Sequence, residues 1–284
     1  MVRLAITGAT GFIGRYVLPL VLDANGDVTV ASRDVSSVPK EWTNRTRITQ
    51  LDLADPGESV FERLGCPDVL LHLAWGDLHN YRSLHHFETE LSRHYRFLKS
   101  MVRSGLKTAI VTGTCFEYGM QAGCLDETTI CQPSTPYGLA KHMLHRQLQF
   151  LQEETPYNLI WARLFYTYGE GQSPTSLWSQ LKKAALAGET TFPMSGGEQL
   201  RDFLPVAELA GYLARLALDQ PRTEVINICS GRPQSVRSLV ESWIRTEGWS
   251  ITPLLGRFPY TEYEPFAFWG ARERLSSFVG QAKQ

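Results

Sequence analysis

Three glycines near the start of the chain restrict its fold more than any other feature. Gly8, Gly11 and Gly14 lie between a short apolar, β-branched run (VRLAIT) and a run with apolar residues at helical spacing (RYVLPLVL), so they occupy a strand-to-helix turn. Such a turn needs glycine where φ is positive and where the backbone approaches a ligand, and the N–H groups that open the helix can bind an anion. The pattern alone leaves two interpretations open: a turn that binds phosphate, or a turn with a purely structural role.

Strand-like runs recur through the first half of the chain, with helix-length segments between most of them. This alternation predicts an α/β fold with a doubly wound parallel sheet, whose ligands bind at the carboxyl ends of the strands. The alternation of strand-like and helix-length segments ends near residue 165. Beyond it, prolines and glycines are frequent and an aromatic-rich stretch follows. We therefore expect a main domain over residues 1–165 and a smaller mixed α/β region over residues 166–284, with about 202–230 returning to the main domain.

Charge and hydropathy exclude two classes of partner. The formal net charge of the 284-residue chain is -1, and its Lys and Arg residues are dispersed, which argues against nucleic-acid binding. The longest apolar run near the start is interrupted by Thr7, Gly8 and Arg15, so it fits neither a secretory signal nor a membrane span. We expect a cytoplasmic protein that does not bind membranes.

Neither the cysteines nor the histidines form a metal-binding pattern. The five cysteines form an odd set without a CxxC pair, as expected of reduced thiols: Cys66, Cys115, Cys124, Cys131 and Cys229. His142 and His145 share one face of a probable helix, but no carboxylate or cysteine pattern completes a ligand set. We expect a solvated helix face there and no metal. His72, in an apolar strand, is expected to be a core histidine without a chemical role.

A tyrosine and a lysine form the candidate catalytic pair. Tyr137 and Lys141 stand four residues apart on a predicted helix, so their side chains leave the same face. A nearby ammonium stabilises a phenolate and brings proton exchange by tyrosine within reach of neutral pH. Thr114, at the end of a middle strand, would supply a hydroxyl that orients the substrate oxygen.

The glycine turn, the hydroxyl at the end of a middle strand and the Tyr-Lys pair occur in this order along the chain. In this the sequence resembles the extended short-chain dehydrogenase/reductase family of nucleotide-sugar epimerases, dehydratases and ketoreductases. The resemblance covers nearly the whole chain and includes the segments TGATGFIG, LDLAD, LHLAW, TGTCFEYG, PYGLAK, ARLFYTYGEGQ, GGEQLRDFLPVAELA and INICSG. It implies a Rossmann dinucleotide-binding domain, a substrate-binding C-terminal region and a homodimer. The implied cofactor-binding residues are Gly8, Thr10, Gly11, Phe12, Ile13, Gly14, Ser32, Arg33, Asp52, Leu53, Leu73, Ala74, Tyr137, Lys141 and Phe165.

The end of the second strand indicates the choice of cofactor. Members of such folds that prefer NAD carry an acidic residue there, which binds the ribose 2′-OH. This chain has Ser32 and Arg33, which suit a 2′-phosphate, although Asp34 follows directly. We therefore expect NADP, with NAD less favoured.

The residues after Thr114 indicate the reaction. Dehydratases of the family carry Asp-Glu there, whereas this chain has Cys115 and Phe116, which cannot do the acid–base work of a carboxylate. What remains is hydride transfer at a carbinol or ketone carbon. The chain most resembles bacterial nucleotide-diphosphate 4-keto-6-deoxyhexose reductases, and a dTDP-4-dehydro-6-deoxyhexose 4-reductase is the sharpest expectation. The alternatives are a 4-epimerase with tightly bound NAD and a non-catalytic protein that senses NADP.

The resemblance also suggests a set of substrate-binding residues. Arg201 is the candidate for the substrate's diphosphate, with a surface ion pair to Asp202 as the alternative. Trp75, Glu117 and Tyr260 are candidates either for the sugar pocket or for packing and the pocket rim, and Glu90 stands where the family commonly has Asn. The full implied set for a nucleotide-diphosphate sugar is Trp75, Thr114, Cys115, Phe116, Tyr137, Tyr166 and Arg201, where Tyr166 replaces the family's usual Asn.

Overall fold

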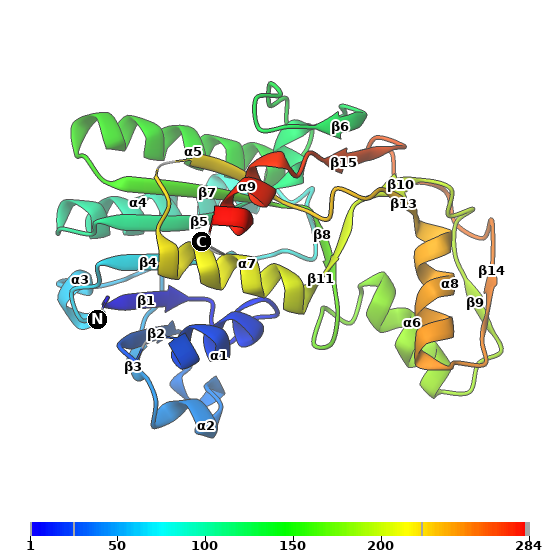
Figure 1. The fold of residues 1–284 in the computed structure, drawn as a ribbon, viewed down its shortest axis with the longest axis horizontal. Coiled ribbons are helices and arrows are strands. Elements are labelled where there is room, and N and C mark those ends of the chain that lie inside the picture. Colours follow the sequence, from blue (N-terminus) through cyan, green and yellow to red (C-terminus); the bar gives the residue numbers. More distant parts are fainter. Residues whose placement is uncertain (1, 25, 223, 282–284) are drawn as a thin grey trace.

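The main part of the molecule is a seven-stranded parallel sheet with helices on both faces (Figure 1). The computed structural model describes residues 2–24, 26–222 and 224–281. The strand order β12-β7-β5-β4-β1-β2-β3 runs outward from β1 in both directions, which confirms the predicted doubly wound Rossmann sheet. The strands are β1 (Leu4–Thr7), β2 (Val28–Ser32), β3 (Arg47–Gln50), β4 (Val69–His72), β5 (Thr108–Thr114), β7 (Asn158–Leu164) and β12 (Glu224–Ile228).

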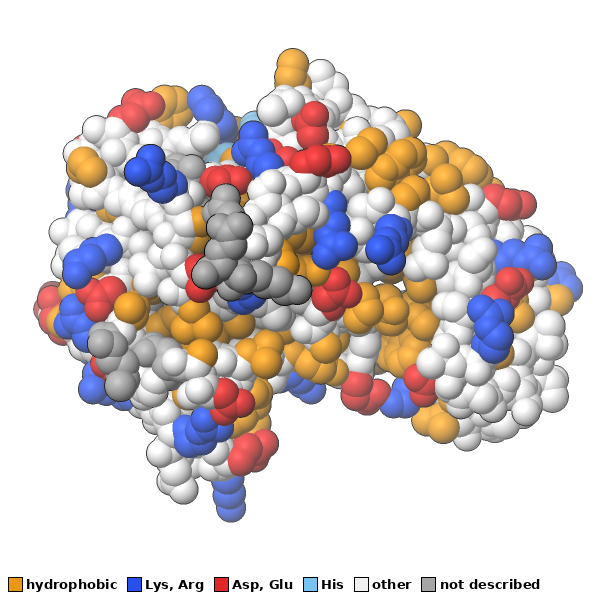
Figure 2. Space-filling model, viewed as in Figure 1, with side chains coloured by type: hydrophobic (Ala, Val, Ile, Leu, Met, Phe, Trp, Pro, Cys, Tyr) orange, Lys and Arg blue, Asp and Glu red, His pale blue; other side chains and the backbone are white. Residues whose placement is uncertain are grey.

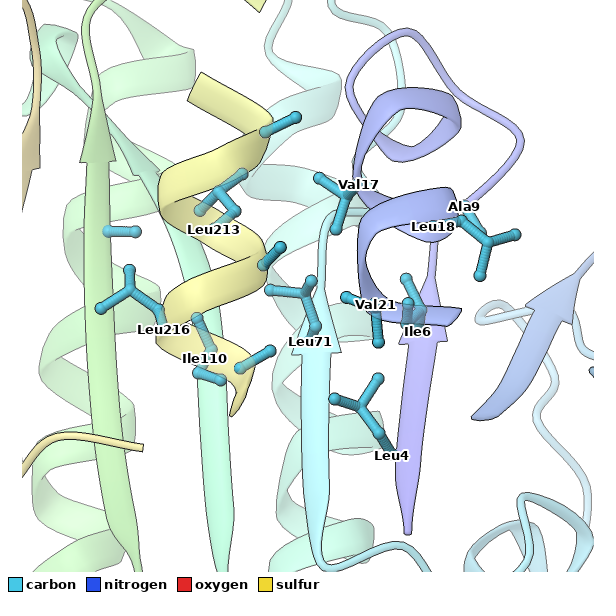
Figure 3. Packing of buried hydrophobic residues seen from close by; sticks show 14 of the residues in the cluster. Leu4, Ile6, Ala9, Val17, Leu18, Val21, Leu71, Ile110, Leu213 and Leu216 are labelled. Atoms are coloured by element: carbon cyan, nitrogen blue, oxygen red, sulfur yellow. The ribbon is translucent and has the colours of Figure 1, made fainter. Parts of the chain in front are cut away.

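The central strands are apolar almost throughout because both of their faces are buried. Successive side chains of a strand point to opposite faces, so Ile6 packs in the cluster on one face while its neighbour Ala5 packs in the cluster on the other. On the first face, residues of α1 and α7 such as Val17 and Leu213 close over the strands (Figure 3). The helices of this face are α1 (Gly14–Ala24), α7 (Val206–Asp219) and α9 (Glu273–Gln281), and those of the other are α3 (Val60–Arg63), α4 (Leu91–Arg103) and α5 (Pro136–Glu154).

A smaller part lies beyond the carboxyl ends of the sheet strands and has its own apolar cluster (Figure 1). Leu181, Val240 and Trp243 are among its buried residues. In the space-filling view, hydrophobic side chains are visible in the hollow between this part and the sheet (Figure 2). Its elements are α6 (Leu177–Leu186), β9 (Thr191–Pro193), α8 (Val236–Glu247) and β14 (Thr252–Leu254).

The chain passes between the two parts several times. After α6 and β9 it returns to the main part, where α7 packs on α1 and β12 pairs with β7. The division into domains at residue 165 stays a prediction. Short strand pairs bridge the crossings, namely β8 (Tyr166–Tyr168) with β11 (Phe203–Pro205), β10 (Leu200–Arg201) with β13 (Gln234–Ser235), and β6 (Gly123–Leu125) with β15 (Phe268–Gly270).

The remaining helical segments are short. They are α2 (Lys40–Thr43) and the single turns η1 (Val35–Ser37), η2 (His86–Glu90) and η3 (Cys115–Tyr118). Within the described residues, no helix combines the length and the apolar character that crossing a membrane would require.

Candidate active site

A cavity of about 550 Å³ opens at the carboxyl ends of β1, β2 and β4. The structure brings to its wall most of the predicted cofactor-binding residues, from four segments far apart in the sequence. The predicted residues that line it are Gly8, Thr10, Gly11, Phe12, Ile13, Gly14, Ser32, Arg33, Asp52, Leu53, Leu73 and Ala74, joined by Trp75. Phe165 is instead packed in an apolar cluster with Cys229 and Phe268 and does not line this cavity.

The glycine turn at the cavity requires glycine for two physical reasons. Gly8 has φ of +75°, and a Cβ there would lie 2.8 Å from the backbone nitrogen of Ala74. A Cβ on Gly14 would overlap the carbonyl oxygen of Gly8, since the first turn of α1 crosses close over the loop. The backbone therefore lines the cavity with no side chain in the way at these positions. A dinucleotide pyrophosphate fits this arrangement, because the N-terminus of α1 presents free N–H groups to an anion.

The end of β2 places polar groups at one end of the same cavity. The Asp34 carboxylate accepts hydrogen bonds from the Ser36 backbone N–H (2.9 Å) and hydroxyl (2.6 Å), which lower its pKa. The carboxylate therefore caps the turn η1. The Arg33 guanidinium has no hydrogen-bond or ion-pair partner among residues 2–24, 26–222 and 224–281. The Arg33 guanidinium could therefore donate hydrogen bonds to a ligand phosphate in this cavity.

The predicted catalytic residues meet where β5 ends and α5 begins. Thr114 ends β5 and caps η3, its hydroxyl accepting from the Phe116 N–H at 3.3 Å. Thr135 caps α5 by accepting from the Gly138 N–H at 3.1 Å, which places Tyr137 in the first turn. A hydrogen bond with Thr114 acts on the Tyr137 hydroxyl. The structure therefore brings the hydroxyls of Thr114 and Tyr137 together.

The charge state of the pair differs from the sequence-based expectation. Burial raises the pKa of Tyr137, and the hydrogen bond with Thr114 offsets only part of this rise. Burial also lowers the pKa of Lys141 to about 7, against the attraction of Glu117 and Glu90. The expectation that Lys141 brings the Tyr137 pKa down is therefore not met in this structure, because the same low-dielectric site disfavours both charged forms.

Lys141 is held by one carbonyl and one aromatic ring. Its Nζ donates to the Thr112 carbonyl oxygen at 2.8 Å and lies 3.9 Å from the centre of the Trp75 ring. The same ring stacks on His94, with 4.4 Å between ring centres. The Trp75 indole N–H donates to His86 Nδ1 at 3.1 Å. Trp75 is thus a fixed aromatic support beneath the ammonium.

A buried chain of polar side chains runs behind Trp75. Because the Glu90 carboxylate can only accept, His94 donates to it through Nε2–H at 3.2 Å, and His94 Nδ1 then accepts from His72 Nε2–H at 2.7 Å. Thr7 completes the chain by donating to His72 Nδ1 at 2.8 Å. Burial lowers the pKa of both histidines, which keeps them neutral as this pattern requires.

Sequence reasoning did not identify His94 as part of this site. It noted Glu90 only as a residue that differs from the Asn common in the family. Burial alone would raise the pKa of Glu90, but hydrogen bonds from His94, Gly76 and Arg93 bring it down to about 2. Glu90 and His94 stand four residues apart, which predicts a shared helical face. That spacing, beside a buried His72, is the signal that could have identified the chain.

The structure decides between the two roles expected for Glu117, and it shows that the solvated helix face expected for His145 is wrong. Glu117 does not line a pocket, since its fully buried carboxylate accepts from Trp161 Nε1 at 2.9 Å and from Arg163 Nε at 3.1 Å. His145 is not on a solvated face, since it is 5% exposed and stacks on Trp161. The Trp161 indole, between β7 and α5, contacts both Glu117 and His145. Helical spacing alone cannot reveal such a contact.

One group of potential metal ligands occurs among the described residues, formed by Glu117, Cys131 and His142. The Arg163 guanidinium already neutralises Glu117, and burial raises the pKa of the Cys131 thiol to about 11. A cation would have to displace the arginine and deprotonate this thiol, so these residues do not favour a metal.

Arg201 is buried and paired, but not with Asp202. Its guanidinium Nε and one terminal nitrogen contact the Glu264 carboxylate at 3.2 and 3.0 Å. Asp202 instead accepts from the backbone N–H groups of Ser230 (2.7 Å) and Gly231 (2.9 Å). Of the other predicted substrate-binding residues, Cys115, Phe116 and Tyr166 pack in one apolar cluster that also contains Tyr137 of the catalytic pair.

Comparison with known protein families identifies the family of this chain. The model of the NAD dependent epimerase/dehydratase family matches residues 4–229. The chain belongs to this family. The family assignment expected from the sequence motifs is therefore confirmed, and with it a place among enzymes that use nicotinamide dinucleotides.

Similar proteins act on nucleotide sugars, as their names state. The dTDP-6-deoxy-L-talose 4-dehydrogenase (NAD(+)) of Aggregatibacter actinomycetemcomitans is 33% identical over 272 residues, which cover 95% of this chain and 100% of that protein. The dTDP-6-deoxy-L-talose 4-dehydrogenase (NAD(P)(+)) of Kitasatospora kifunensis is 25% identical over 96% of this chain and 89% of its own length. The structure of MoeE5 in complex with UDP-glucuronic acid and NAD has a TM-score of 0.83 and 25% identity, covering 98% of this chain and 92% of that one.

Proposed function

We propose that this chain is an NADP(H)-dependent oxidoreductase that reduces the C4 ketone of a nucleotide-diphospho-4-keto-6-deoxyhexose, with a dTDP sugar as the favoured substrate. The observation that carries the proposal is the set of groups beside Tyr137. Thr114 is followed by Cys115, whose pKa burial raises, and by Phe116. Neither is a carboxylate that could move a proton for elimination, so transfer at C4 remains the reaction that the site supports.

The named relatives support the same carbon and the same chemistry. A 4-dehydrogenase that acts on dTDP-6-deoxy-L-talose oxidises the C4 alcohol to a ketone, and the reverse of this step is the reduction proposed here. One active site catalyses both directions, because the forward and reverse reactions share a transition state. The relatives' names therefore agree with the proposal in substrate class and reaction centre.

In the proposed reduction, each side chain of the site has a separate role. The bound nicotinamide supplies or accepts the hydride, which no protein side chain can do. Tyr137 donates a proton to the C4 oxygen, and the Thr114 hydroxyl holds that oxygen by a hydrogen bond. Lys141, with a pKa of about 7, binds the ribose hydroxyls and restores the proton to Tyr137. Trp75 supports the Lys141 ammonium from below.

Arg33 favours NADP over NAD. Its guanidinium is a suitable donor for a 2′-phosphate, while the nearest carboxylate, on Asp34, is occupied by Ser36. The named relatives include both an NAD and an NAD(P) enzyme. Measured dissociation constants of NADPH and NADH for the purified protein test the preference, and we expect NADPH to bind at least about tenfold more tightly.

A 4-epimerase is the second candidate, because several related proteins carry that name. The UDP-glucose 4-epimerase of Neisseria meningitidis serogroup C is 23% identical over 88% of this chain. An epimerase regenerates its cofactor in every cycle and would retain it. A protein that senses NADP without catalysis is the candidate from another class, and it would bind cofactor without converting any nucleotide sugar.

The experiment that separates these functions is a substrate screen. The purified protein is incubated with nucleotide-diphospho-4-keto-6-deoxyhexoses and NADPH, loss of NADPH absorbance is followed, and the product is identified by NMR. We expect NADPH consumption that matches product formation one to one. C4 epimers formed without NADPH consumption would assign the epimerase, and cofactor binding without any product would assign the sensor.

A further inference from the structure

Arg201 is the cation expected to meet the substrate's diphosphate, and this structure shows it occupied by a carboxylate of its own chain. The Arg201 side chain is 5% exposed and that of Glu264 12% exposed. The Glu264 Oε2 atom accepts from Arg201 Nε at 3.2 Å and from Nη2 at 3.0 Å. The remaining terminal nitrogen donates to the carbonyl oxygens of Leu200 (2.9 Å) and Phe266 (3.1 Å). No edge of the guanidinium is left for a phosphate while Glu264 is in place.

The surroundings of this pair resemble a ligand site more than a structural core. A cavity of about 190 Å³ adjoins the pair and is lined by Gln199, Arg201, Tyr260, Thr261, Glu264 and Phe266. One buried polar atom nearby, Gln199 Oε1, has no hydrogen-bond partner within the described part of the chain, whereas the buried Tyr166 hydroxyl interacts with Glu264 itself. The Tyr166 ring centre lies 5.9 Å from the Arg201 guanidinium carbon. An unpaired buried polar atom is costly, so a polar ligand that reached Gln199 Oε1 would relieve it.

The segment that carries Glu264 is exposed over most of the stretch before this residue. It connects β14 to β15, and residues 256–262 are exposed along its whole length. Phe258, for example, is 58% exposed. The residues on either side of Glu264, Tyr263 and Pro265, are packed, so we expect the Glu264 side chain to turn toward the exposed residues 256–262 while its neighbours stay in place.

We propose that Glu264 is an internal competitor for the substrate's diphosphate: it neutralises Arg201 in the free protein and is displaced when a nucleoside diphosphate binds. This inference rests on the proposed function for the identity of the ligand. A diphosphate carries more negative charge than one carboxylate and matches the guanidinium fork with two oxygens. Displacement thus exchanges one ion pair for a stronger one, and no buried arginine is left without a counter-ion.

The competition has a defined thermodynamic consequence. If only the fraction of molecules with Glu264 displaced binds the diphosphate, the apparent dissociation constant exceeds the intrinsic one by the reciprocal of that fraction. The same factor applies to every ligand that must reach Arg201. It does not apply to ligands without a phosphate, which leave Arg201 with Glu264.

Removing the competitor tests the proposal. Glu264→Gln keeps the shape of the side chain and removes its charge, and binding of dTDP and of inorganic pyrophosphate is measured by calorimetry. We expect both to bind about tenfold more tightly than to the wild type, with the affinity for thymidine unchanged. Glu264→Asp, which keeps the charge but shortens the reach, should give a smaller gain and covers the case in which Glu264→Gln fails to fold.

The matched control is Glu262→Gln, because Glu262 is an exposed carboxylate on the same segment. We expect it to leave the affinity for dTDP unchanged. An unchanged or weaker affinity for dTDP in Glu264→Gln, or an equal gain in Glu262→Gln, would overturn the proposal.

The two proposals fail separately. If Glu264→Gln gains affinity for dTDP but no 4-keto sugar is reduced, only the proposed reaction is wrong. If the sugar is reduced and the affinity for dTDP does not change, only the role of Glu264 is wrong.

Discussion

At the residue scale, the behaviour of Tyr137 and Lys141 depends on their burial as much as on their four-residue spacing. Both side chains are almost fully enclosed, Tyr137 at 8% and Lys141 at 1% exposure. The enclosure raises the pKa of the tyrosine and lowers that of the lysine. Tyr137 therefore stays protonated in the free protein, as a proton donor to a ketone oxygen must.

Removing the Tyr137 hydroxyl tests its role as proton donor. We expect Tyr137→Phe to lower the turnover number by a factor on the order of 100 or more, the scale of a lost general acid, and to leave NADPH affinity within about twofold. Steady-state kinetics and fluorescence titration measure the two quantities.

The control for this variant is Tyr157→Phe. The Tyr157 hydroxyl is also buried and donates to the Leu148 carbonyl oxygen at 2.9 Å, near the start of β5 and so at the opposite end of that strand from Thr114. Its loss should lower stability by about 1 kcal/mol without changing turnover. Near wild-type turnover in Tyr137→Phe would show that another group donates the proton.

Lys141 makes stability depend on pH with a definite sign. Its folded pKa of about 7 lies below the ordinary value of 10.5, so between these values the unfolded chain binds the extra proton. Stability therefore rises with pH across this window, and below it the folded protein bears the full cost of a buried charge. Lys141→Met removes that cost.

We expect Lys141→Met to exceed the wild type in stability most at about pH 6, with the difference shrinking by about 2 kcal/mol by about pH 9. Urea unfolding of both proteins at these pH values measures the difference. A difference that stays constant or grows as the pH rises would contradict the assignment of a lowered pKa to Lys141.

At the element scale, the contact between the β1–α1 turn and the first turn of α1 sets the shape of the cofactor cavity. A Cβ at Gly14 would meet the Gly8 carbonyl oxygen and the Ala9 backbone, which are rigid. We expect Gly14→Ala to destabilise the protein by about 1 to 3 kcal/mol and to weaken NADPH binding, because the turn must open. Thermal unfolding and cofactor titration test both effects.

Gly211, inside α7, is the matched control. Among the described residues, no atom beyond its chain neighbours and the adjoining backbone of α7 lies within 4 Å of a Cβ placed there. Gly211→Ala should stabilise the protein by about 0.5 to 1 kcal/mol, since alanine loses less conformational freedom in a helix. Equal effects of the two substitutions would mean that the close approach at Gly14 is not what requires glycine.

At the scale of the whole molecule, the sheet and the glycine turn could be predicted because their signals are local. Apolar runs of strand length and a glycine cluster at a strand-to-helix turn are properties of neighbouring residues. The predicted positions of Thr114, Tyr137 and Lys141 relative to the sheet followed from the same alternation.

The parts that sequence reasoning missed depend on contacts between distant segments. Glu264 reaches Arg201 across 63 positions of the chain, and His72 reaches His94 across 22. The sequence left Glu117 open between a pocket and a packing role, and only the fold shows that Arg163 of β7 neutralises it. A single sequence carries no local pattern for such pairs.

The central claim is net hydride transfer to C4 of a 4-keto-6-deoxy nucleotide sugar, and isotopic labelling tests it most directly. The protein is incubated with this substrate and with NADPH deuterated at C4 of the nicotinamide, each face in turn, and the product is examined by NMR. The account predicts one deuterium at C4 of the sugar from one of the two faces, with NADPH consumed one to one. Interconversion of C4 epimers without deuterium in the product and without loss of NADPH would contradict it.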